Sequence, residues 1–334
     1  MQSLPRTEES TAGGMMGGLP EGVRLPEAPP LGFDPMGASD ELLVRHGLPP
    51  RPDPASEPES YAWWMKVCSW PRSYVPPGFE PLSEHPAGSG ERPSPVYRST
   101  RWSGAVISAT QGYKFEEVRG TWDVSRPLPD NKAWKRTHWD SGTFRAAAWV
   151  GIDGYQSHDV LQAGTGHVCT TSIHQDAEYH THAWWEWYPQ HPWRLTGFQV
   201  QPGDLVHCYI RATDSTQAAI YFYNDSACTY TSFHVTAPQG VSLKGNCAEW
   251  IVEASTASSP PKTAYLGATF IFDCEAVEQD NRHRRKHRDL TGAMFVQAEQ
   301  DGEVLSTARS DLSNAKVVGI VAERRTHVIN IPTQ

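Results

Sequence analysis

Short apolar runs recur from about residue 99 to the C-terminus, and many of them alternate apolar with polar residues. Gly, Pro, Asn, Asp and Ser separate these runs at the interval typical of a β-sandwich or barrel. Almost no segment repeats its apolar residues at the helical period. The runs lie at residues 101–110, 115–124, 144–153, 159–164, 183–189, 204–213, 218–224, 230–236, 247–254, 266–274, 293–298 and 315–322. The pattern predicts an all-β, antiparallel fold of two packed sheets, a β-sandwich.

One of these runs, "GNCAEWIVEA" at residues 245–254, places carboxylates inside an otherwise apolar strand. Alternation predicts a core face that consists of Ala248, Trp250, Val252 and Ala254. Glu249 and Glu253 fall on the other face, although Glu is depleted from strands. Taken alone, this alternation is typical of a sheet with one solvent-facing side.

The first 98 residues differ in composition from the rest of the chain. They contain 18 of the 27 prolines, and proline removes ladder donors and fixes φ. We therefore predict an extended, mostly irregular N-terminal arm over residues 1–98 and a sandwich domain over 99–334. The exception within the arm is "YAWWMKVCSW" at 61–70, a short element that we expect to pack on the sandwich through Trp63, Trp64 and Trp70.

The net charge of −9 argues against a nucleic-acid partner, because binding phosphates requires a basic surface. The basic run "NRHRRKHRD" at 281–289 is interpreted as a solvated loop, since no nucleic-acid motif accompanies it. No apolar run approaches the length of a membrane span, and no signal peptide is visible at the N-terminus. The compartment and the oligomeric state are left open.

The six cysteines are far apart and form no CxxC pair, which favours free buried thiols over a zinc site or a disulfide framework. The signatures GxSxG, HExxH, P-loop and GxGxxG are all absent. "DSGT" at 140–143 resembles an aspartic peptidase loop, but that chemistry requires two such aspartates and the chain has one copy.

A metal site is a second candidate. His180 and His182 alternate on one predicted strand, Glu186 follows, and "PGDLVH" supplies His207. The arrangement resembles the half-motifs of a cupin, whose histidines and glutamate bind a divalent metal. The match is partial, because His174 stands where a glycine is expected. We favour histidines at loop edges that bind no metal, and we predict no cofactor.

Three further segments carry a stronger resemblance. "AWVGIDGYQSHDVLQAG" at 148–164, "AWWEWYP" at 183–189 and "CAEWIVEA" at 247–254 resemble, in order, the motifs of the glutamic peptidases, the eqolisin family. Weaker likeness flanks them, at "RWSGAVI" (101–107) and "LTGFQVQPGDLVHCYI" (195–210). The resemblance covers roughly residues 100–275. It implies a jelly-roll, concanavalin-like sandwich and an endopeptidase that acts on extended polypeptides.

The resemblance implies a catalytic pair formed by Gln162 and Glu249, on one face of a sheet that lines a cleft. It also implies supporting roles for Trp102, Trp149, Asp153 and Glu186, which line the cleft or brace the pair. Alternation agrees for Gln162, which shares a strand face with Val160 and is opposite Leu161 and Ala163. Trp149 is equally compatible with a place in the core, and Asp153 with a turn.

A carboxylate and an amide suffice for peptide hydrolysis. The carboxylate can act as the general base for water, and the amide N–H can donate to the developing oxyanion. Glu186 lies among aromatic residues, where burial raises a carboxyl pKa. The family resemblance implies a working range on the acid side of neutral. His182 replaces a common acid of the family, and as a cation it would lower the pKa of Glu249.

Other departures from the family pattern are Cys247, in place of the usual Asn, and "GIDGYQS", which lacks an Asp and a Cys. Members of the family are generally secreted. Residues 1–98 would then be either an inhibitory propeptide, as such members carry, or a permanent structural strap. The rival function is a non-catalytic jelly roll whose Trp-rich face binds carbohydrate or peptide, for which the 13 Trp and 12 Tyr are also suited.

Overall fold

The computed structural model describes residues 18–82, 98–129, 134–135, 138–139, 141–155, 157, 159–172, 175–254, 262–300, 302–311 and 314–322. Strands dominate this part of the chain, and the all-β prediction is confirmed. Neither of the two helices in it is long and apolar enough to span a bilayer. The helices and the strands of the first half are α1 (Asp40–Arg45), α2 (Pro58–Cys68), β1 (Ser73–Tyr74), β2 (Phe79–Pro81), β3 (Arg98–Ser99), β4 (Trp102–Ser108), β5 (Tyr113–Asp123), β6 (Trp134–Lys135), β7 (His138–Trp139), β8 (Gly142–Asp153) and β9 (Val160–Ser172). The remaining strands are β10 (Gln175–Trp187), β11 (Trp193–Leu195), β12 (Leu205–Ala212), β13 (Gln217–Asn224), β14 (Thr229–Thr236), β15 (Cys247–Ala254), β16 (Ala268–Asp280), β17 (Arg285–Arg288), β18 (Met294–Gln300), β19 (Glu303–Asp311) and β20 (Asn314–Ala322).

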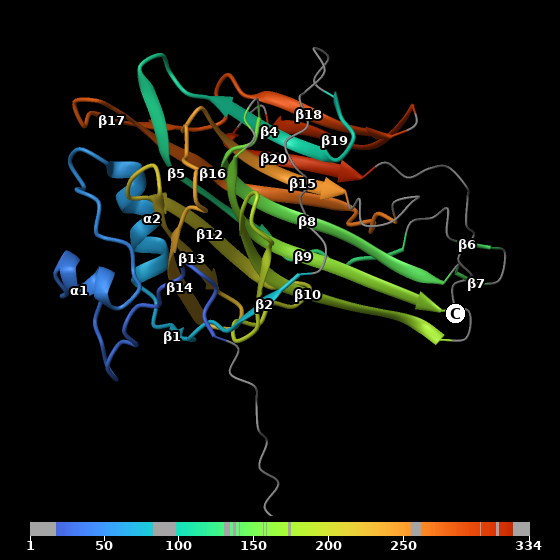
Figure 1. The fold of residues 1–334 in the computed structure, drawn as a ribbon, viewed down its shortest axis with the longest axis horizontal. Coiled ribbons are helices and arrows are strands. Elements are labelled where there is room, and N and C mark those ends of the chain that lie inside the picture. The colour runs from blue at the N-terminus through green and yellow to red at the C-terminus, as the bar shows by residue number, and fades with distance from the viewer. Residues whose placement is uncertain are drawn as a thin grey trace, which may run out of the picture.

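The strands, apart from the β6–β7 hairpin, form one hydrogen-bonded sheet of 18 strands (Figure 1). One half runs in the order β2, β11, β10, β9, β8, β15, β4 and β18. The other half runs from β18 through β19, β20, β16, β5, β12, β13 and β14 to β1. These pairings are antiparallel except β1–β14, and β3 also pairs parallel with β18. The sheet is therefore mixed and continuous through β18.

The main hydrophobic core lies between the two halves of this sheet. Trp250 of β15 donates its indole N–H to the carbonyl of Arg119 in β5 at 2.7 Å. Trp122 of β5 donates in the other direction to Thr165 Oγ1 of β9 at 3.0 Å. Both indoles are fully buried, so each crosses the core to satisfy its donor on the opposite half.

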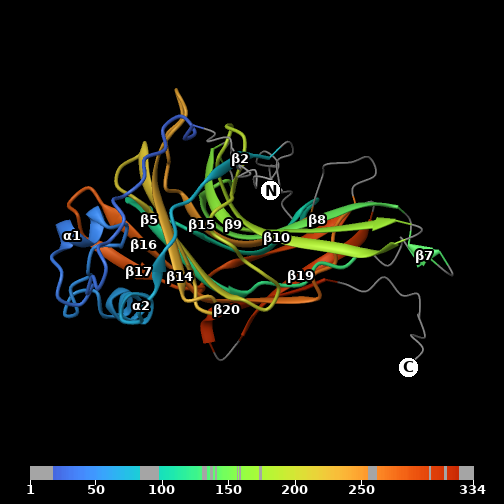
Figure 2. The same ribbon diagram turned by 90° about the horizontal axis from the view of Figure 1, so that it is seen from below.

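The N-terminal segment packs on the outer side of β12, β13 and β14 (Figures 1 and 2). Its described residues 18–82 contain two helices and two short strands, so this part is less irregular than its proline content suggests. α2 begins at Pro58, a favoured first helical position. Trp63 and Trp64 are buried against a tyrosine cluster of the sheet, as expected, whereas Trp70 is 70% exposed and its expected packing is wrong.

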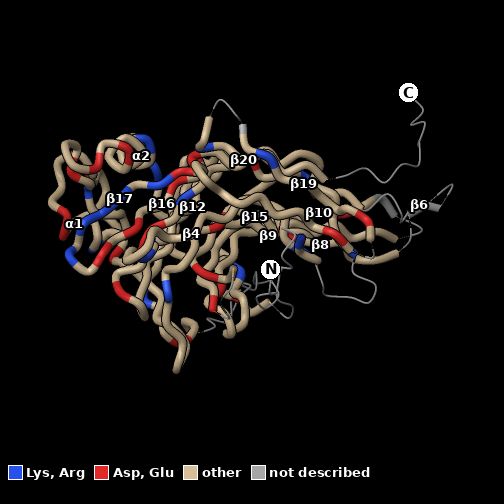
Figure 3. Tube along the Cα trace, turned by 90° about the horizontal axis from the view of Figure 1, so that it is seen from above, with Lys and Arg blue, Asp and Glu red and all other residues tan. Residues whose placement is uncertain are grey.

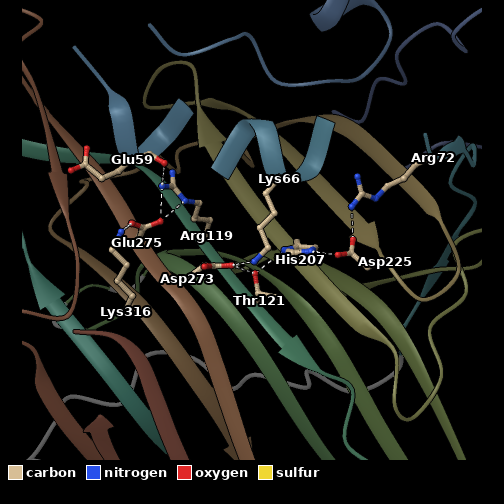
Figure 4. Close-up of polar contacts among 10 residues, drawn as sticks. All are labelled: Glu59, Lys66, Arg72, Arg119, Thr121, His207, Asp225, Asp273, Glu275 and Lys316. Carbon is tan, nitrogen blue, oxygen red and sulfur yellow. Dashed lines mark hydrogen bonds and ion pairs between the residues drawn. The ribbon is translucent and has the colours of Figure 1, made fainter. Parts of the chain in front are cut away.

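Ion pairs fasten this segment to the sheet (Figure 4). Lys66 of α2 contacts Asp273 at 2.7 Å, and Arg72 contacts Asp225 at 2.6 Å. Beyond β1 the chain continues to β2, which pairs with β11. The described part of the segment thus reaches from one half of the sheet to the other.

Only part of the basic run at 281–289 is the predicted solvated loop, because residues 281–284 form an exposed turn. Residues 285–288 form β17, which pairs antiparallel with β16. Arg285 contacts Glu117 at 2.7 Å, and Arg288 contacts Glu278 at 3.0 Å. Figure 3 shows acidic and basic stretches mixed around β16 and β17. The pattern along one strand could not reveal these acidic partners, because they come from β5 and β16.

All six cysteines are free, as predicted, and five of them are buried.

Candidate active site

The half of the sheet that runs from β2 to β18 through β10, β9, β8, β15 and β4 has one face that points away from the main core. Polar residues lie on this face. We call it the polar face. It is made by alternate residues of β4, β8, β9, β10 and β15, whose intervening residues form the main core. On β15 these are Cys247, Glu249, Ile251 and Glu253, as alternation predicted. Glu249 and Glu253 are fully buried, so this face is not the solvent-facing side that alternation alone would suggest.

Strand register sets four residues of the polar face in one row. Glu249 of β15 is paired with Gly151 of β8, Gly151 with Gln162 of β9, and Gln162 with Glu186 of β10. Residues directly opposite each other on antiparallel strands point to the same face. Gly151 has no side chain, and the Trp149 ring and the Gln162 side chain border the space above it. The row brings together both residues of the predicted pair and Glu186.

Gln162 and Glu186 interact directly. The Gln162 Nε2 donates to Glu186 Oε2 at 2.8 Å, and both side chains are at most 1% exposed. The Gln162 Oε1 is buried and has no hydrogen-bond partner. A carboxylate oxygen that accepts this bond fixes which end of the amide is the NH₂ group. Glu186 therefore orients Gln162.

Glu249 has one oxygen engaged and one without a partner. Its Oε1 accepts from the backbone N–H of Tyr155 at 2.8 Å and lies 3.5 Å from the Cys247 thiol. Its Oε2 is buried without a hydrogen-bond partner. That oxygen faces Gly154, where an added Cβ would lie 3.1 Å from it. An unpartnered buried carboxyl oxygen is costly to maintain and is typical of functional sites.

Burial raises the pKa of Glu249 from 4.5 to about 8, against the opposing hydrogen bonds from Tyr155 and Cys247. We expected a cationic His182 to lower the pKa of Glu249, and this expectation is wrong. His182 is itself buried, and burial, followed by the nearby Arg194 guanidinium, lowers its pKa to about 3. His182 is therefore neutral at the pH values where Glu249 would ionise.

Asp153 shapes the turn that supports Glu249. It adopts a left-handed conformation with φ of 65°, and its two oxygens accept three backbone N–H bonds of 2.6 to 3.0 Å from residues 244–246. These residues lead directly into β15. Asp153 is thus a brace for the strand that carries Glu249, with both turn and hydrogen-bond roles.

The two predicted tryptophans lie on the polar face beside the row. Trp102 and Trp149 pack edge to face with ring centroids 5.2 Å apart. Trp149 donates its indole N–H to Glu253 Oε2 at 3.0 Å, and it is fully buried. They belong to a cluster with Val106, Trp184 and Ile251. The expected open cleft differs from the structure at this end, where these side chains enclose the row.

The sequence did not reveal several of these contacts. Tyr155 acts through its backbone N–H, which any residue other than proline provides, so its identity carries no signal. The Trp149–Glu253 hydrogen bond joins β8 and β15, and the pairing of these two strands cannot be predicted from a single sequence. The sequence did indicate the position of Glu253, because alternation along the strand places it on the same face as Glu249.

The candidate metal set is separated by the fold. His180 and His182 lie on the polar face of β10, whereas His207 of β12 lies on the outer side of the other half. His207 is held by Thr121 at 2.7 Å and by Asp225 at 2.9 Å (Figure 4). Among the residues that the structure describes, no three His, Cys, Asp or Glu side chains are grouped to hold a metal ion. Asp140 of the aspartic peptidase-like loop lies outside the described residues.

Comparisons with known proteins agree with the motifs. A sequence model of the peptidase A4 family matches residues 100–319. Aspergillopepsin-2 of Aspergillus niger is 26% identical over 224 residues, which are 62% of this chain and 73% of that protein. Scytalidopepsin B of Scytalidium lignicola is 27% identical over 187 residues, 53% of this chain and 64% of that protein. The crystal structure of scytalido-glutamic peptidase with a transition state analog inhibitor matches with a TM-score of 0.51 and 21% identity, over 67% of this chain and 99% of that one.

Proposed function

The chain belongs to the peptidase A4 family and is a glutamic-type endopeptidase, a hydrolase of peptide bonds, and from this premise we propose that Glu249 and Gln162 carry out the hydrolysis. The resemblance of its three motifs to the glutamic peptidases is confirmed. The observation that carries the proposal is the row across four strands, Glu249, Gly151, Gln162 and Glu186.

In the proposed mechanism, Glu249 is the general base. Ionised Glu249 takes a proton from the attacking water as the water oxygen bonds to the scissile carbonyl carbon. Glu249 then returns that proton to the leaving nitrogen, the C–N bond breaks, and the carboxylate is restored. The unpartnered Oε2 is the atom suited to this role, because Oε1 is already engaged by Tyr155.

Gln162 stabilises the oxyanion in this scheme. Its NH₂ group has two hydrogens, and Glu186 accepts one of them. The other is available for the oxygen of the tetrahedral intermediate. Loss of one oxyanion donor typically costs 10²–10³ in kcat, or about 3–4 kcal/mol of barrier. Glu186 contributes by holding the amide in the donating orientation.

The proposed substrate is an extended polypeptide, which would lie over the polar face near Trp102, Trp149 and Trp184. A related solved structure, also of scytalido-glutamic peptidase, holds a peptide based transition state analog. For the scaffold, we interpret the two halves of the sheet as the two antiparallel sheets of a jelly-roll sandwich. Peptide binding requires the aromatic side chains that enclose the row to move aside.

The rival functions receive less support. A binding module has no need of an oriented amide beside a carboxylate with a free oxygen, and both are present here. A cupin-like metal protein requires His207 beside His180 and His182, and those residues lie on opposite sides of the main core.

The test is hydrolysis of a denatured protein across a pH series by wild type, Glu249→Gln and Gln162→Ala. We expect each variant to lose at least about 100-fold in kcat/KM. Glu178→Gln is the matched control, because Glu178 is an exposed carboxylate on the same strand as Glu186. Retention of wild-type turnover by Glu249→Gln would refute the assignment. EDTA should leave the rate unchanged.

A further inference from the structure

We propose that the polar face carries an anion-binding subsite, centred on Arg194, that selects substrates with an acidic side chain two to four residues from the scissile bond. We call Arg194, His180 and Arg145 the cationic subsite. The inference rests on the proposed roles of Glu249 and Gln162, and it adds the substrate class that the same face would prefer.

Arg194 lies on the polar face by register. It is paired with Trp184 of β10, and its neighbour Leu195 is part of the main core. Trp184 is in turn paired with Gly164, and Gly164 with Trp149, so Arg194 ends the row next to the Glu249–Glu186 row. Trp184 is two residues from Glu186, which is about 7 Å along a strand.

His180 and Arg145 lie further along the same face. Each is paired with Val168, from opposite sides of β9. The pKa of the His180 imidazole is lowered, first by partial burial and then by Arg194 and Arg145. Both arginines also act on His182, whose ring covers Gly166. Arg194 therefore lies close enough to His180 to disfavour protonation of its ring, and a bound anion would oppose this effect.

Arg194 differs from the arginines on the outer side of the molecule. Arg119 and Arg211 are each paired with a buried glutamate. Within the described residues, Arg194 has no side-chain hydrogen bond or ion pair, and its Nε is buried without a partner. Arg194 is half-buried, and His180 is exposed, so this end of the polar face is in contact with solvent.

The described acidic groups nearest to Arg194 do not pair with it. Glu80 of β2 is paired with Arg194 through the backbone but is exposed and forms no ion pair with it within the described residues. Glu178 of β10 lies one position beyond His180 on the same face and is exposed. Glu253 of β15 is buried and engaged by the Trp149 indole. The unmatched charge of Arg194 is thus available to a substrate carboxylate.

Arginine binds a carboxylate through two parallel N–H bonds, which favours Asp or Glu over their amides. An extended peptide advances about 3.3 Å per residue. Arg194 lies one residue pair along β10 and two strands across from Gln162, so the selected residue falls two to four positions from the cleaved bond.

The test uses peptides of one length in which a single Glu or Gln is moved through the positions around one cleavable bond. We expect kcat/KM to be about tenfold higher for Glu than for Gln at one position within that range. The Glu/Gln ratio should fall toward one below about pH 4, where the substrate carboxyl protonates while Arg194 stays charged. A ratio near one at every position above pH 5 overturns the subsite.

Three variants test whether the Glu/Gln ratio of kcat/KM depends on Arg194. Arg194→Gln should reduce the ratio to about one, and Arg194→Glu should invert it. Arg282→Gln, in the exposed turn between β16 and β17, should keep the wild-type ratio. An unchanged ratio in Arg194→Gln overturns the role of Arg194.

Binding provides a second measurement that does not depend on turnover. In the Glu249→Gln background, the Kd of the Glu peptide should be about tenfold lower than that of the Gln peptide, and adding Arg194→Gln should abolish the difference. Equal Kd values in the Glu249→Gln background overturn the subsite. If Glu249→Gln remains fully active, the proposed catalytic base fails, and the ratio measured with Arg194→Gln still decides the subsite.

Discussion

At the scale of single residues, Glu249 shows the conflict between stability and function. A carboxyl group with no exposed surface and one unpartnered oxygen is disfavoured in its charged form. The same isolation raises its pKa to about 8 and makes it a stronger base once it is ionised. Two measurements follow from this one property.

The first measurement is stability against pH. The pKa of Glu249 is about 8 in the fold and about 4.5 in the unfolded chain, so the folded state binds the extra proton. The stabilisation of the folded state by protonated Glu249 is fully present below pH 4.5 and is lost as pH rises through 8. The shift corresponds to up to about 5 kcal/mol of unfolding free energy.

Glu249→Gln cannot ionise, so we expect it to unfold at a higher temperature than wild type at pH 8 and at a similar temperature at pH 4.5. Thermal unfolding at the two pH values provides the comparison, and Glu178→Gln should follow wild type at both. If the difference in unfolding temperature between wild type and Glu249→Gln is the same at both pH values, Glu249 has an ordinary pKa.

The second measurement is the pH dependence of catalysis. A general base must be ionised, so the acid limb of kcat/KM reports the pKa of Glu249 in the free enzyme. We expect this limb above 4.5 and toward 8, higher than the acidic working range that the family resemblance implied. A peptide without titratable side chains is the appropriate substrate. An acid limb at or below pH 4.5 would contradict the buried environment as the source of the base.

At the scale of elements, the central feature is the register of β15, β8, β9 and β10. Alternation within each strand predicted the faces of Glu249 and Gln162 correctly. It could not predict that Gly151 separates them, because register depends on pairing between distant segments. Arg194 was missed for a similar reason, since β11 is only three residues long and follows no clear pattern. The family motifs identified Glu249 and Gln162 from the sequence, whereas the residues that surround this pair became known only from the fold.

Gly151→Ala tests this register. The added Cβ would lie 2.9 Å from Trp149 Cζ3 and 3.4 Å from the Gln162 Cβ, in the space between the pair. We expect kcat/KM to fall at least about tenfold because a displacement of about 1 Å in an active site costs up to 10²-fold. Gly120→Ala is the control, because its Cβ meets Ile271 and Val150 at 2.9 Å within the main core. It should lower the melting temperature and retain the kcat/KM of the folded enzyme.

At the scale of the whole molecule, most of the described N-terminal segment packs away from the polar face, and only Leu82 at its end packs against the cluster of Trp102 and Trp149. α2 lies on the outer side of β12 to β14 (Figure 1). Glu249 belongs to the polar face, on the far side of the main core. Buried Trp64 donates to the Pro49 carbonyl at 2.9 Å, and Arg51 lies over its ring. We therefore propose the strap over the inhibitory propeptide for this part of the arm.

Trp64→Ala distinguishes the two roles. We expect it to cost about 3–5 kcal/mol of unfolding free energy, because the indole is fully buried. A strap predicts no gain in kcat/KM at a temperature where the variant is folded. Trp70→Ala, at a residue 70% exposed, should change neither quantity. Higher peptidase activity in Trp64→Ala would favour an inhibitory segment.

The continuity of the sheet through β18 has a consequence for the order in which the chain can fold during synthesis. β4, near residue 100, pairs with β15 and β18, and the Gln300 amide contacts the Thr100 carbonyl across 200 positions of sequence. Because loop closure must precede such pairing, folding is slow for this kind of topology. β4 stays without its partner β18 until nearly all of the described chain has left the ribosome. A nascent chain stopped before residue 294 therefore exposes the edge of β4 that β18 would cover, and that edge is open to pairing with other chains.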